Sequence, residues 1–287
     1  MKLFLDCIPC HIKQAFNALE MLGIDGKEKE DVIKKILEVI SNFKFYKKNY
    51  LLYADIQKII KKIAPKKDPY KKIKESFNKT CLAMSSDLIG MIEDSNESFG
   101  TSLRIALAGN IIDIMQGNEL SEEIIRKAIN KALNQNIDKN KIKLLRENIS
   151  NSKKILYIGD NAGEIVFDKI FIQQFLDDKV TFAVRGGPTL NDVTLEDADA
   201  IGMTDHIKVI TTGLDMPGAF LPICSREFLD EYEKSDLIIA KGQGNLEALI
   251  DEKKNIFFLL KIKCKVIAGV FSHKYKVGDV AVENITQ

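Results

Sequence analysis

The stretch that decides the fold is residues 155–164, which read ILYIGDNAGE. Its first four residues are apolar, and three of them are β-branched or aromatic, which is typical of a strand buried on both faces. Asp160 and Asn161 follow at the carboxyl end of this strand, and a helix is expected to begin directly after them. Open α/β sheets bind their ligands at this end, where the next helix presents free backbone N–H groups. The stretch therefore predicts an α/β fold with a ligand site at Asp160 and Asn161.

The rest of the chain supports the same fold class. Short apolar runs at residues 155–158, 180–184, 207–210, 237–240 and 256–260 alternate with helical patterns, which indicates βαβ units and a parallel sheet. Residues 11–150 instead show helical spacing, for example at Ile33, Ile36, Leu37 and Ile40. We expect an α/β protein with an N-terminal helical domain, residues 1–150, and a C-terminal, doubly wound, mostly parallel Rossmann-like sheet, residues 151–287.

Composition limits the classes of function. The chain has 287 residues, 45% of them hydrophobic, which is ample for two domains. It has no apolar run near the length of a membrane span, and its first residues do not resemble a secretory signal. An odd number of cysteines, five, favours a reducing, cytoplasmic setting. Residues 44–79 are rich in lysine, but such a run is more often a solvated helical face than a nucleic-acid site, so we expect neither a membrane nor a nucleic-acid partner.

Adjacent oxygen-bearing side chains make residues 160–161 a candidate metal site. Asp160 and Asn161 offer a carboxylate and an amide oxygen, which are ligands that hard divalent cations prefer. The simpler alternative is that one of them caps the following helix by accepting a backbone N–H.

A second motif, VRGGPTLNDVT at residues 184–194, follows the next expected strand and should reach the same edge of the sheet. Arg185 can bind an oxyanion with two parallel hydrogen bonds, and Asp192 supplies another carboxylate. The alternative is a turn followed by a helix that Asp192 or Thr194 caps, a role that is compatible with metal binding.

A third motif, AKGQGNLE at residues 240–247, also follows a strand. Lys241 is a compact cation suited to a phosphate group, and the neighbouring glycines leave backbone amides accessible. We expect Gly242 and Asn245 to line the substrate site beside it. The motif is not a P-loop, because its lysine precedes the glycines. An ordinary glycine-rich turn is the alternative.

Two further motifs lie in the helical region. Asn110 and Asp113, in AGNIID at residues 108–113, share one helix face and could reach a cleft or be structural. Cys7 and Cys10, in DCIPCH at residues 6–11, could belong to a metal or redox site or be an inert pair.

Taken together, these motifs resemble the metal-dependent damage-control phosphatase family over nearly the whole chain. The opening at residues 6–14, DPY at 68–70 and KGQGN at 241–245 resemble its stand-alone prokaryotic subgroup, which carries a CxxC pair. The resemblance implies a metal held by Asp160, Asn161 and Asp192, and a phosphate contact by Lys241. It also implies that the element carrying Asn110 and Asp113 faces the cleft. Eukaryotic members have Gly-Asp-Leu-Asn where this chain has GQGN, so their substrate preferences do not transfer to it.

The expected function is metal-dependent hydrolysis of a small phosphomonoester, such as a sugar phosphate, a nucleotide or a cofactor-precursor phosphate, in metabolite damage control. Mg²⁺, Mn²⁺, Co²⁺ and Ni²⁺ are all candidate cofactors, and either water or the Asp160 carboxylate could attack phosphorus. One alternative is an S-adenosylmethionine-dependent carboxyl methyltransferase, which the turn at residues 159–164 matches poorly. The other is a non-enzymatic nucleic-acid or redox module built on the lysine stretch or the cysteines. The oligomeric state is left open.

Overall fold

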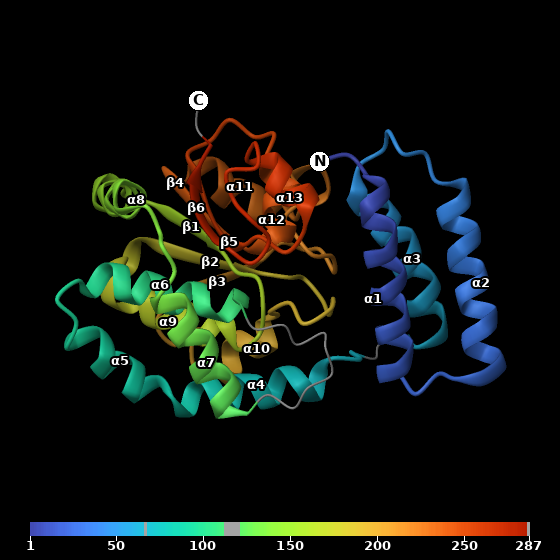
Figure 1. Ribbon diagram of the computed structural model, residues 1–287, viewed down its shortest axis with the longest axis horizontal. Coiled ribbons are helices and arrows are strands. Elements are labelled where there is room, and N and C mark those ends of the chain that lie inside the picture. The colour runs from blue at the N-terminus through green and yellow to red at the C-terminus, as the bar shows by residue number, and fades with distance from the viewer. Residues whose placement is uncertain (66–67, 112–120, 286–287) are drawn as a thin grey trace. The chain divides into compact units, whose positions relative to one another are not determined.

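The computed structural model describes residues 1–65, 68–111 and 121–285, and within it the chain divides into two compact units, Met1–Lys72 and Ile73–Gln287. The first unit contains three long helices, α1 (Ile8–Met21), α2 (Gly26–Asn42) and α3 (Asn49–Ile63), after a short 3-10 turn, η1 (Leu5–Cys7) (Figure 1). Their inward faces form an apolar core that includes Leu19, Ile36, Leu52 and Ile56. The helical spacing in the sequence predicts these helices correctly, because each buries one apolar stripe.

The second unit is built on a sheet. The described residues form one six-stranded sheet in the order β3-β2-β1-β4-β5-β6. Its strands are β1 (Ile155–Ile158), β2 (Val180–Val184), β3 (Lys208–Thr211), β4 (Leu237–Lys241), β5 (Ile256–Lys261) and β6 (Val280–Asn284). The first five strands are parallel, and β6 pairs antiparallel with β5. All five predicted strands are present, within one residue at their ends, while β6 was not predicted.

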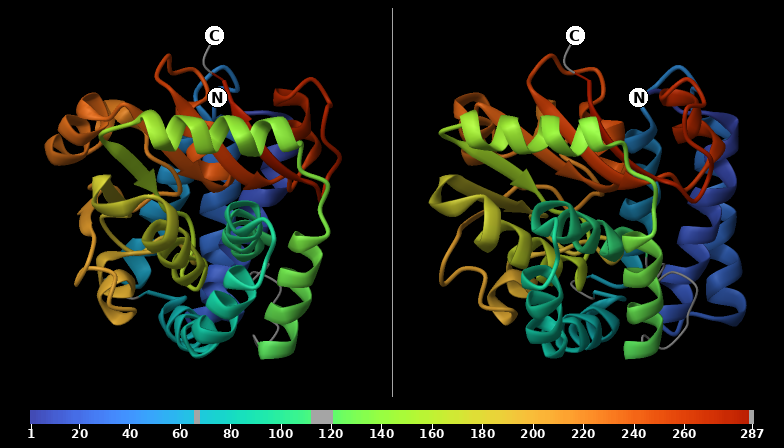
Figure 2. Two further views of the ribbon diagram at one scale, coloured as in Figure 1. Left: turned by 90° about the vertical axis from the view of Figure 1, so that its left-hand side faces the viewer. Right: turned by 60° about the vertical axis from the view of Figure 1, so that its left-hand side comes forward.

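Helices cover both faces of this sheet, as expected for a doubly wound fold. Figures 1 and 2 show α6 (Ser98–Ile111) and α9 (Glu164–Phe175) on one face, and α11 (Arg226–Lys234) and α12 (Gly242–Leu249) on the other. The remaining helices are α4 (Lys71–Ala83), α5 (Ser85–Glu93), α7 (Glu122–Leu133), α8 (Lys139–Asn151), α10 (Leu195–Ala200) and α13 (Lys265–Val270). Among the described residues, no helix combines the length and the apolar character that crossing a membrane requires.

The compact units divide at residue 72, whereas the sequence predicts a domain boundary near residue 150. The reason is packing: α4 to α9 and one face of the sheet share a single apolar cluster. Phe77 from α4, Leu103 from α6 and Leu145 from α8 belong to this cluster together with Tyr157 and Phe182 from the sheet. The helices between residues 73 and 151 therefore form one hydrophobic core with the strands that follow them.

Candidate active site

The candidate site lies at the carboxyl ends of β1, β2 and β4. The chain continues from β1 to β2 on one side and from β4 to β5 on the other, so β1 and β4 flank the switch point where open α/β sheets bind ligands. Asp160 and Asn161 follow β1, and Asp192 lies in the loop after β2. The two loops are joined by hydrogen bonds from Val193 N to Asp160 O (2.9 Å) and from Ala162 N to Asn191 O (2.9 Å). The structure thus brings the three predicted metal ligands together.

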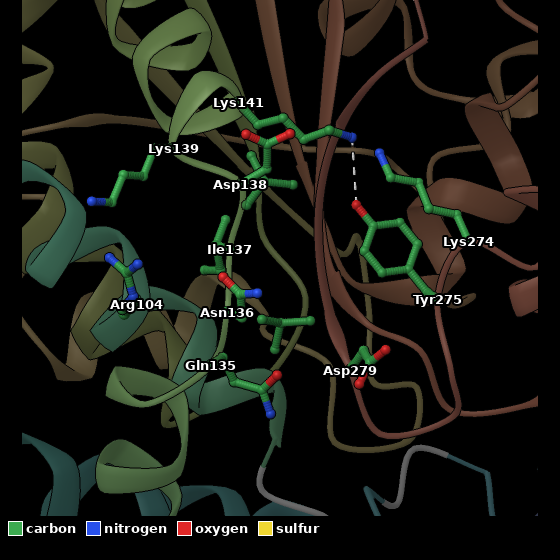
Figure 3. A pocket seen from close by; sticks show the side chains of 12 residues that line it. Arg104, Gln135, Asn136, Ile137, Asp138, Lys139, Lys141, Lys274, Tyr275 and Asp279 are labelled. Carbon is green, nitrogen blue, oxygen red and sulfur yellow. Dashed lines mark hydrogen bonds between the residues drawn. The ribbon is translucent and has the colours of Figure 1, made fainter.

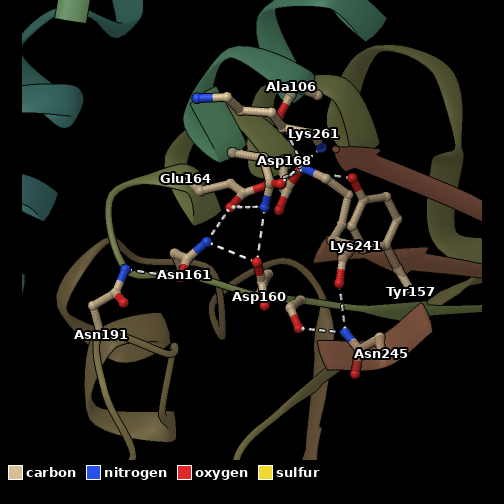
Figure 4. Close-up of polar contacts among 12 residues, drawn as sticks. Ala106, Tyr157, Asp160, Asn161, Glu164, Asp168, Asn191, Lys241, Asn245 and Lys261 are labelled. Atoms are coloured by element: carbon tan, nitrogen blue, oxygen red, sulfur yellow. Dashed lines mark hydrogen bonds and ion pairs between the residues drawn. The ribbon is translucent and has the colours of Figure 1, made fainter. Parts of the chain in front are cut away.

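Amide side chains surround the Asp160 carboxylate. Asn161 Nδ2 and Asn110 Nδ2 each donate to Asp160 Oδ2 at 2.8 Å, and Asn191 Nδ2 donates to Asn161 Oδ1 at 2.8 Å (Figure 4). All four side chains are buried. Asn110, which we expected to bind substrate together with Asp113, lies in this cluster, and Asp113 lies outside the residues that the structure describes.

Helix α4 holds the loops after β1 and β2. Asn78 Oδ1 accepts the backbone N–H of Gly163, and Asn78 Nδ2 donates to Asp197 Oδ1 at 3.0 Å. Asp197 in turn forms a capping box with Thr194 at the start of α10. Thr194, and not Asp192, is therefore the cap of α10. The N-cap residue of α9 is Gly163, so neither Asp160 nor Asn161 is its cap.

Arg185 binds carboxylates of the protein itself. Its Nε donates to Asp192 Oδ2 at 2.6 Å, and its Nη1 donates to Asn245 Oδ1 at 3.1 Å. Its Nη2 lies 3.6 Å from Asp160 Oδ1 and has no hydrogen-bond partner among the described residues. The guanidinium is 1% exposed. It therefore fixes Asp192 beside Asp160, whereas the sequence suggested that it binds the oxyanion of a substrate.

Lys241 is placed differently from the sequence-based expectation. Its side chain is fully buried, and Nζ contacts Glu164 Oε1 (2.7 Å), Asp168 Oδ1 (2.5 Å) and Ala106 O (2.9 Å) (Figure 4). Lys241 ends β4, and by strand alternation it shares the face of Leu237 and Ile239, which pack in the core under α6 and α9. Its ammonium group donates to Asp168 and Ala106 and forms an ion pair with Glu164, so all three of these contacts are protein oxygens.

The loop that follows Lys241 supports Asp160. Gly242 has φ +76°, and a Cβ at this position would lie 2.0 Å from Asp160 Oδ2, so only glycine fits there. Asn245 Nδ2 donates to Lys241 O (2.7 Å) and Gly159 O (3.1 Å). Both residues therefore tie the β4 loop to the β1 loop, which differs from the predicted lining of a substrate site.

Sequence reasoning missed several residues of this site. Glu164 and Asp168, one turn apart on α9, are buried beside Lys241. Lys263 is exposed just after β5, and its charge lowers the pKa of both Asp160 and Asp192. The strand-end rule that identified Asp160 would also have identified Lys263, because β5 is parallel to β4. Nothing local in the sequence shows that Glu164 faces inward.

Negative charge predominates in the buried cluster. Four carboxylates, those of Asp160, Glu164, Asp168 and Asp192, share the cations of Arg185 and Lys241, while the buried Lys74 pairs with Asp197. Burial, followed by the charges of Asp192 and Glu164, raises the pKa of Asp160 to about 7. Burial also raises the pKa of Asp192, and it raises that of Asp168 to about 6 against the opposing effect of Lys241. With all four carboxylates ionised, four negative charges against the two positive charges that they share leave a formal charge of −2.

The donor set fits a divalent cation. Asp160, Asn161 and Asp192 offer carboxylate and amide oxygens, the ligands that hard divalent cations take, and the formal excess of two negative charges in the cluster matches one such ion. The described residues contain, here or elsewhere, no group of three or more His, Cys, Asp or Glu side chains that could hold a metal ion. The Asp-Asn-Asp set has only two acids, so its amide oxygen is essential to it.

A separate open pocket of about 710 Å³ lies beside β6 and contains none of the predicted site residues (Figure 3). Two of its lysines, Lys141 and Lys274, contact the carboxylate of the neighbouring Glu283, which also accepts a hydrogen bond from the Tyr275 hydroxyl.

The chain is similar to known proteins over its full length. The family model described as damage-control phosphatase ARMT1-like domain matches residues 3–277. A damage-control phosphatase of Archaeoglobus fulgidus is 28% identical over 99% of both chains. A damage-control phosphatase of Pyrococcus horikoshii is 38% identical over 59% of this chain and 60% of that protein. An uncharacterized protein of Methanocaldococcus jannaschii is 38% identical to this chain, and the match covers 93% of this chain and 91% of that protein. The crystal structure of a DUF89 family protein from Pyrococcus horikoshii superposes with a TM-score of 0.83 and 29% identity, over 100% of both chains.

Proposed function

Because the chain belongs to the ARMT1-like damage-control phosphatase family, we propose that it is a metal-dependent phosphatase that acts on small phosphomonoesters. Relatives named damage-control phosphatases support the phosphatase role. The observation that carries the metal dependence is the convergence of Asp160, Asn161 and Asp192, in a cluster with a formal excess of two negative charges, at the switch point of the sheet.

Asp160, Asn161 and Asp192 would hold the cation, with Mg²⁺, Mn²⁺, Co²⁺ and Ni²⁺ as candidates. When bound, such an ion supplies Lewis-acid polarisation of a phosphoryl oxygen and orients the attacking group. Arg185 keeps the Asp192 carboxylate in place through its 2.6 Å hydrogen bond, and Asn110 does the same for Asp160. The chain thereby pre-orients its oxygen ligands before any substrate arrives.

Lys263 is our candidate for the phosphate contact in place of Lys241. It is exposed at the carboxyl end of β5, and its charge acts on Asp160 and Asp192. An ammonium group there can neutralise charge on the equatorial oxygens of the transferring phosphoryl group. The buried Lys241, with three protein acceptors, cannot do so in this arrangement.

Within this proposal the substrates are small phosphorylated metabolites, such as sugar phosphates, nucleotides or cofactor-precursor phosphates, consistent with damage control. The test is a phosphate-release screen over a panel of such compounds, with the protein first stripped by a chelator and then supplied with each of the four cations. We expect turnover only after a cation is restored.

The variant that tests the metal site is Asp192→Ala. Asp192 contributes no helix cap, and its loop is also held by backbone hydrogen bonds. This variant should fold, bind the cation more weakly and lose metal-dependent turnover. Undiminished turnover of the stripped wild type, or wild-type metal affinity in Asp192→Ala, would refute the metal site.

A further inference from the structure

Glu164 is a fully buried carboxylate that contacts both asparagines of the site. Its Oε2 accepts hydrogen bonds from Asn161 Nδ2 at 2.8 Å and from Asn110 Nδ2 at 3.3 Å, and its Oε1 pairs with Lys241. It is the first residue of α9, directly after the loop that carries Asp160. Burying a charge in this way is costly unless the charge is compensated and fully hydrogen-bonded, so its placement calls for a function.

The Glu164 carboxylate dictates which end of the Asn161 amide faces the core. A carboxylate can only accept hydrogen bonds, so an amide between Glu164 and Asp160 must turn its NH₂ group toward them. Asn161 Nδ2 has two protons, and these two carboxylates take both of them. Asn161 Oδ1 is consequently the atom on the opposite side, where Asn191 donates to it. Only this orientation presents an oxygen, and not a nitrogen, as a ligand for a cation.

Lys241 holds Glu164 in this position. The ammonium group bridges Glu164 and Asp168, and it also donates to the carbonyl of Ala106 on α6. Asp168 is fixed in turn by the Tyr157 hydroxyl, which donates to its Oδ1 at 2.7 Å. Strand β4, helix α9 and helix α6 thus meet at one ammonium group behind the site.

We propose that Glu164, held by Lys241, is a positioning residue that selects the oxygen-out orientation of Asn161 and so creates the third cation ligand. The inference rests on the proposed metal-dependent function and assigns a role to a buried pair that touches neither substrate nor cation. It also explains why a lysine at the end of β4 points inward.

The test is a double-mutant cycle read out as Mn²⁺ affinity of the full-length, metal-free protein, measured by electron paramagnetic resonance at a pH above 7. Glu164→Gln removes the obligatory acceptor, and we expect Mn²⁺ affinity to fall about tenfold to a hundredfold. Asn161→Asp supplies two equivalent oxygens, so it has no orientation to select. In the Asn161→Asp background, Glu164→Gln should therefore leave Mn²⁺ affinity unchanged or raise it.

Two further variants separate geometry from charge. Glu164→Asp retains the charge that compensates Lys241 but withdraws the carboxylate by one methylene, and we expect it to lose Mn²⁺ affinity as well. If Glu164→Gln does not fold, the Mn²⁺ affinity of Glu164→Asp tests the proposal instead. Asp168→Asn removes a negative charge from the same Lys241 cluster without touching either asparagine, and we expect a smaller loss than for Glu164→Gln.

An equal loss from Glu164→Gln in both backgrounds would show that Glu164 acts by charge alone and would overturn the inference. Unchanged affinity in Glu164→Asp, or an equal loss in Asp168→Asn, would overturn it too. These outcomes leave the proposed function intact. If the wild-type chain binds none of the four candidate cations, both the inference and the metal-dependent function fall.

Discussion

Asp160 is a buried carboxyl group whose pKa lies well above that of a free aspartate side chain. Burial and the neighbouring carboxylates raise its pKa to about 7, so in the metal-free protein it is largely protonated in mildly acidic solution. A cation must displace that proton, since only the ionised carboxylate binds well. We expect Mn²⁺ affinity to fall about tenfold for each pH unit below 7 and to level off above it. Mn²⁺ titrations on both sides of pH 7 measure this dependence, and a flat profile would contradict it.

Lys263 provides a second prediction for a single residue. Lys263→Ala should lower kcat/KM by on the order of 10²-fold, because one charge contact to the phosphoryl group is lost. Mn²⁺ affinity should not weaken, since a positive charge near two ligands has been removed. The control is Lys265→Ala, an equally exposed lysine two residues later at the start of α13. Equal losses in the two variants would mean that Lys263 acts only through the general surface charge.

The contrast between Asp160 and Lys241 shows what could be predicted for the site. A residue that directly follows a parallel strand reaches the ligand edge whatever surrounds it, so the approach of Asp160 to Asp192 could be predicted from the sequence. Lys241 is still within its strand, so its direction depends on alternation and on which face α6 and α9 cover. The packing of these helices is a tertiary property, and the partners Glu164 and Asp168 could not be predicted without it.

At the scale of the elements, the short connection between β4 and α12 determines how closely it can approach the loop after β1, which carries Asp160. Gly242→Ala would place a methyl group 2.0 Å from Asp160 Oδ2 and strain a backbone with φ +76°. We expect a loss of about 1 kcal/mol or more in the free energy of unfolding, together with weaker Mn²⁺ binding. Chemical denaturation and Mn²⁺ titration measure the two effects. Gly90→Ala in α5, where a Cβ meets nothing within 4 Å, is the control and should be neutral or stabilising.

The strands also show which elements a hydrophobic pattern in the sequence can predict and which it cannot. Strands β1, β2, β4 and β5 were predictable because each is a short apolar run buried on both faces. Strand β3 was predicted from its apolar run as well, although only Ile210 of its residues is buried. Strand β6 ends in Glu283 and Asn284 and lies at the edge of the sheet, so its sequence lacks that continuous apolar character.

For the whole molecule, the division into units follows hydrophobic packing and not the change in secondary structure. The sequence changes character near residue 152, where helices give way to alternating strands and helices. The apolar cluster nevertheless continues from Phe77 to Val282 across that point, while residues 3–60 form a core of their own. The sequence pattern predicts the change in secondary structure near residue 152. It does not predict where one hydrophobic core ends and the other begins, because that depends on which apolar faces pack together.

This division leads to a prediction about Cys7 and Cys10, which lie at the start of α1 in the unit Met1–Lys72. The hydrogen bonds given above for Asp160, Asn161 and Asp192 come from residues within Ile73–Gln287, and we expect them to hold the cation ligands without the thiols. We expect Cys7→Ser/Cys10→Ser to retain measurable phosphatase activity per correctly folded molecule and an unchanged metal content by elemental analysis. Any cost should be seen in the thermal stability of the helical unit. Complete loss of turnover in a double variant that is folded and still holds its cation at Asp160 would place the cysteines in the active site, and the catalytic machinery would then extend over both units.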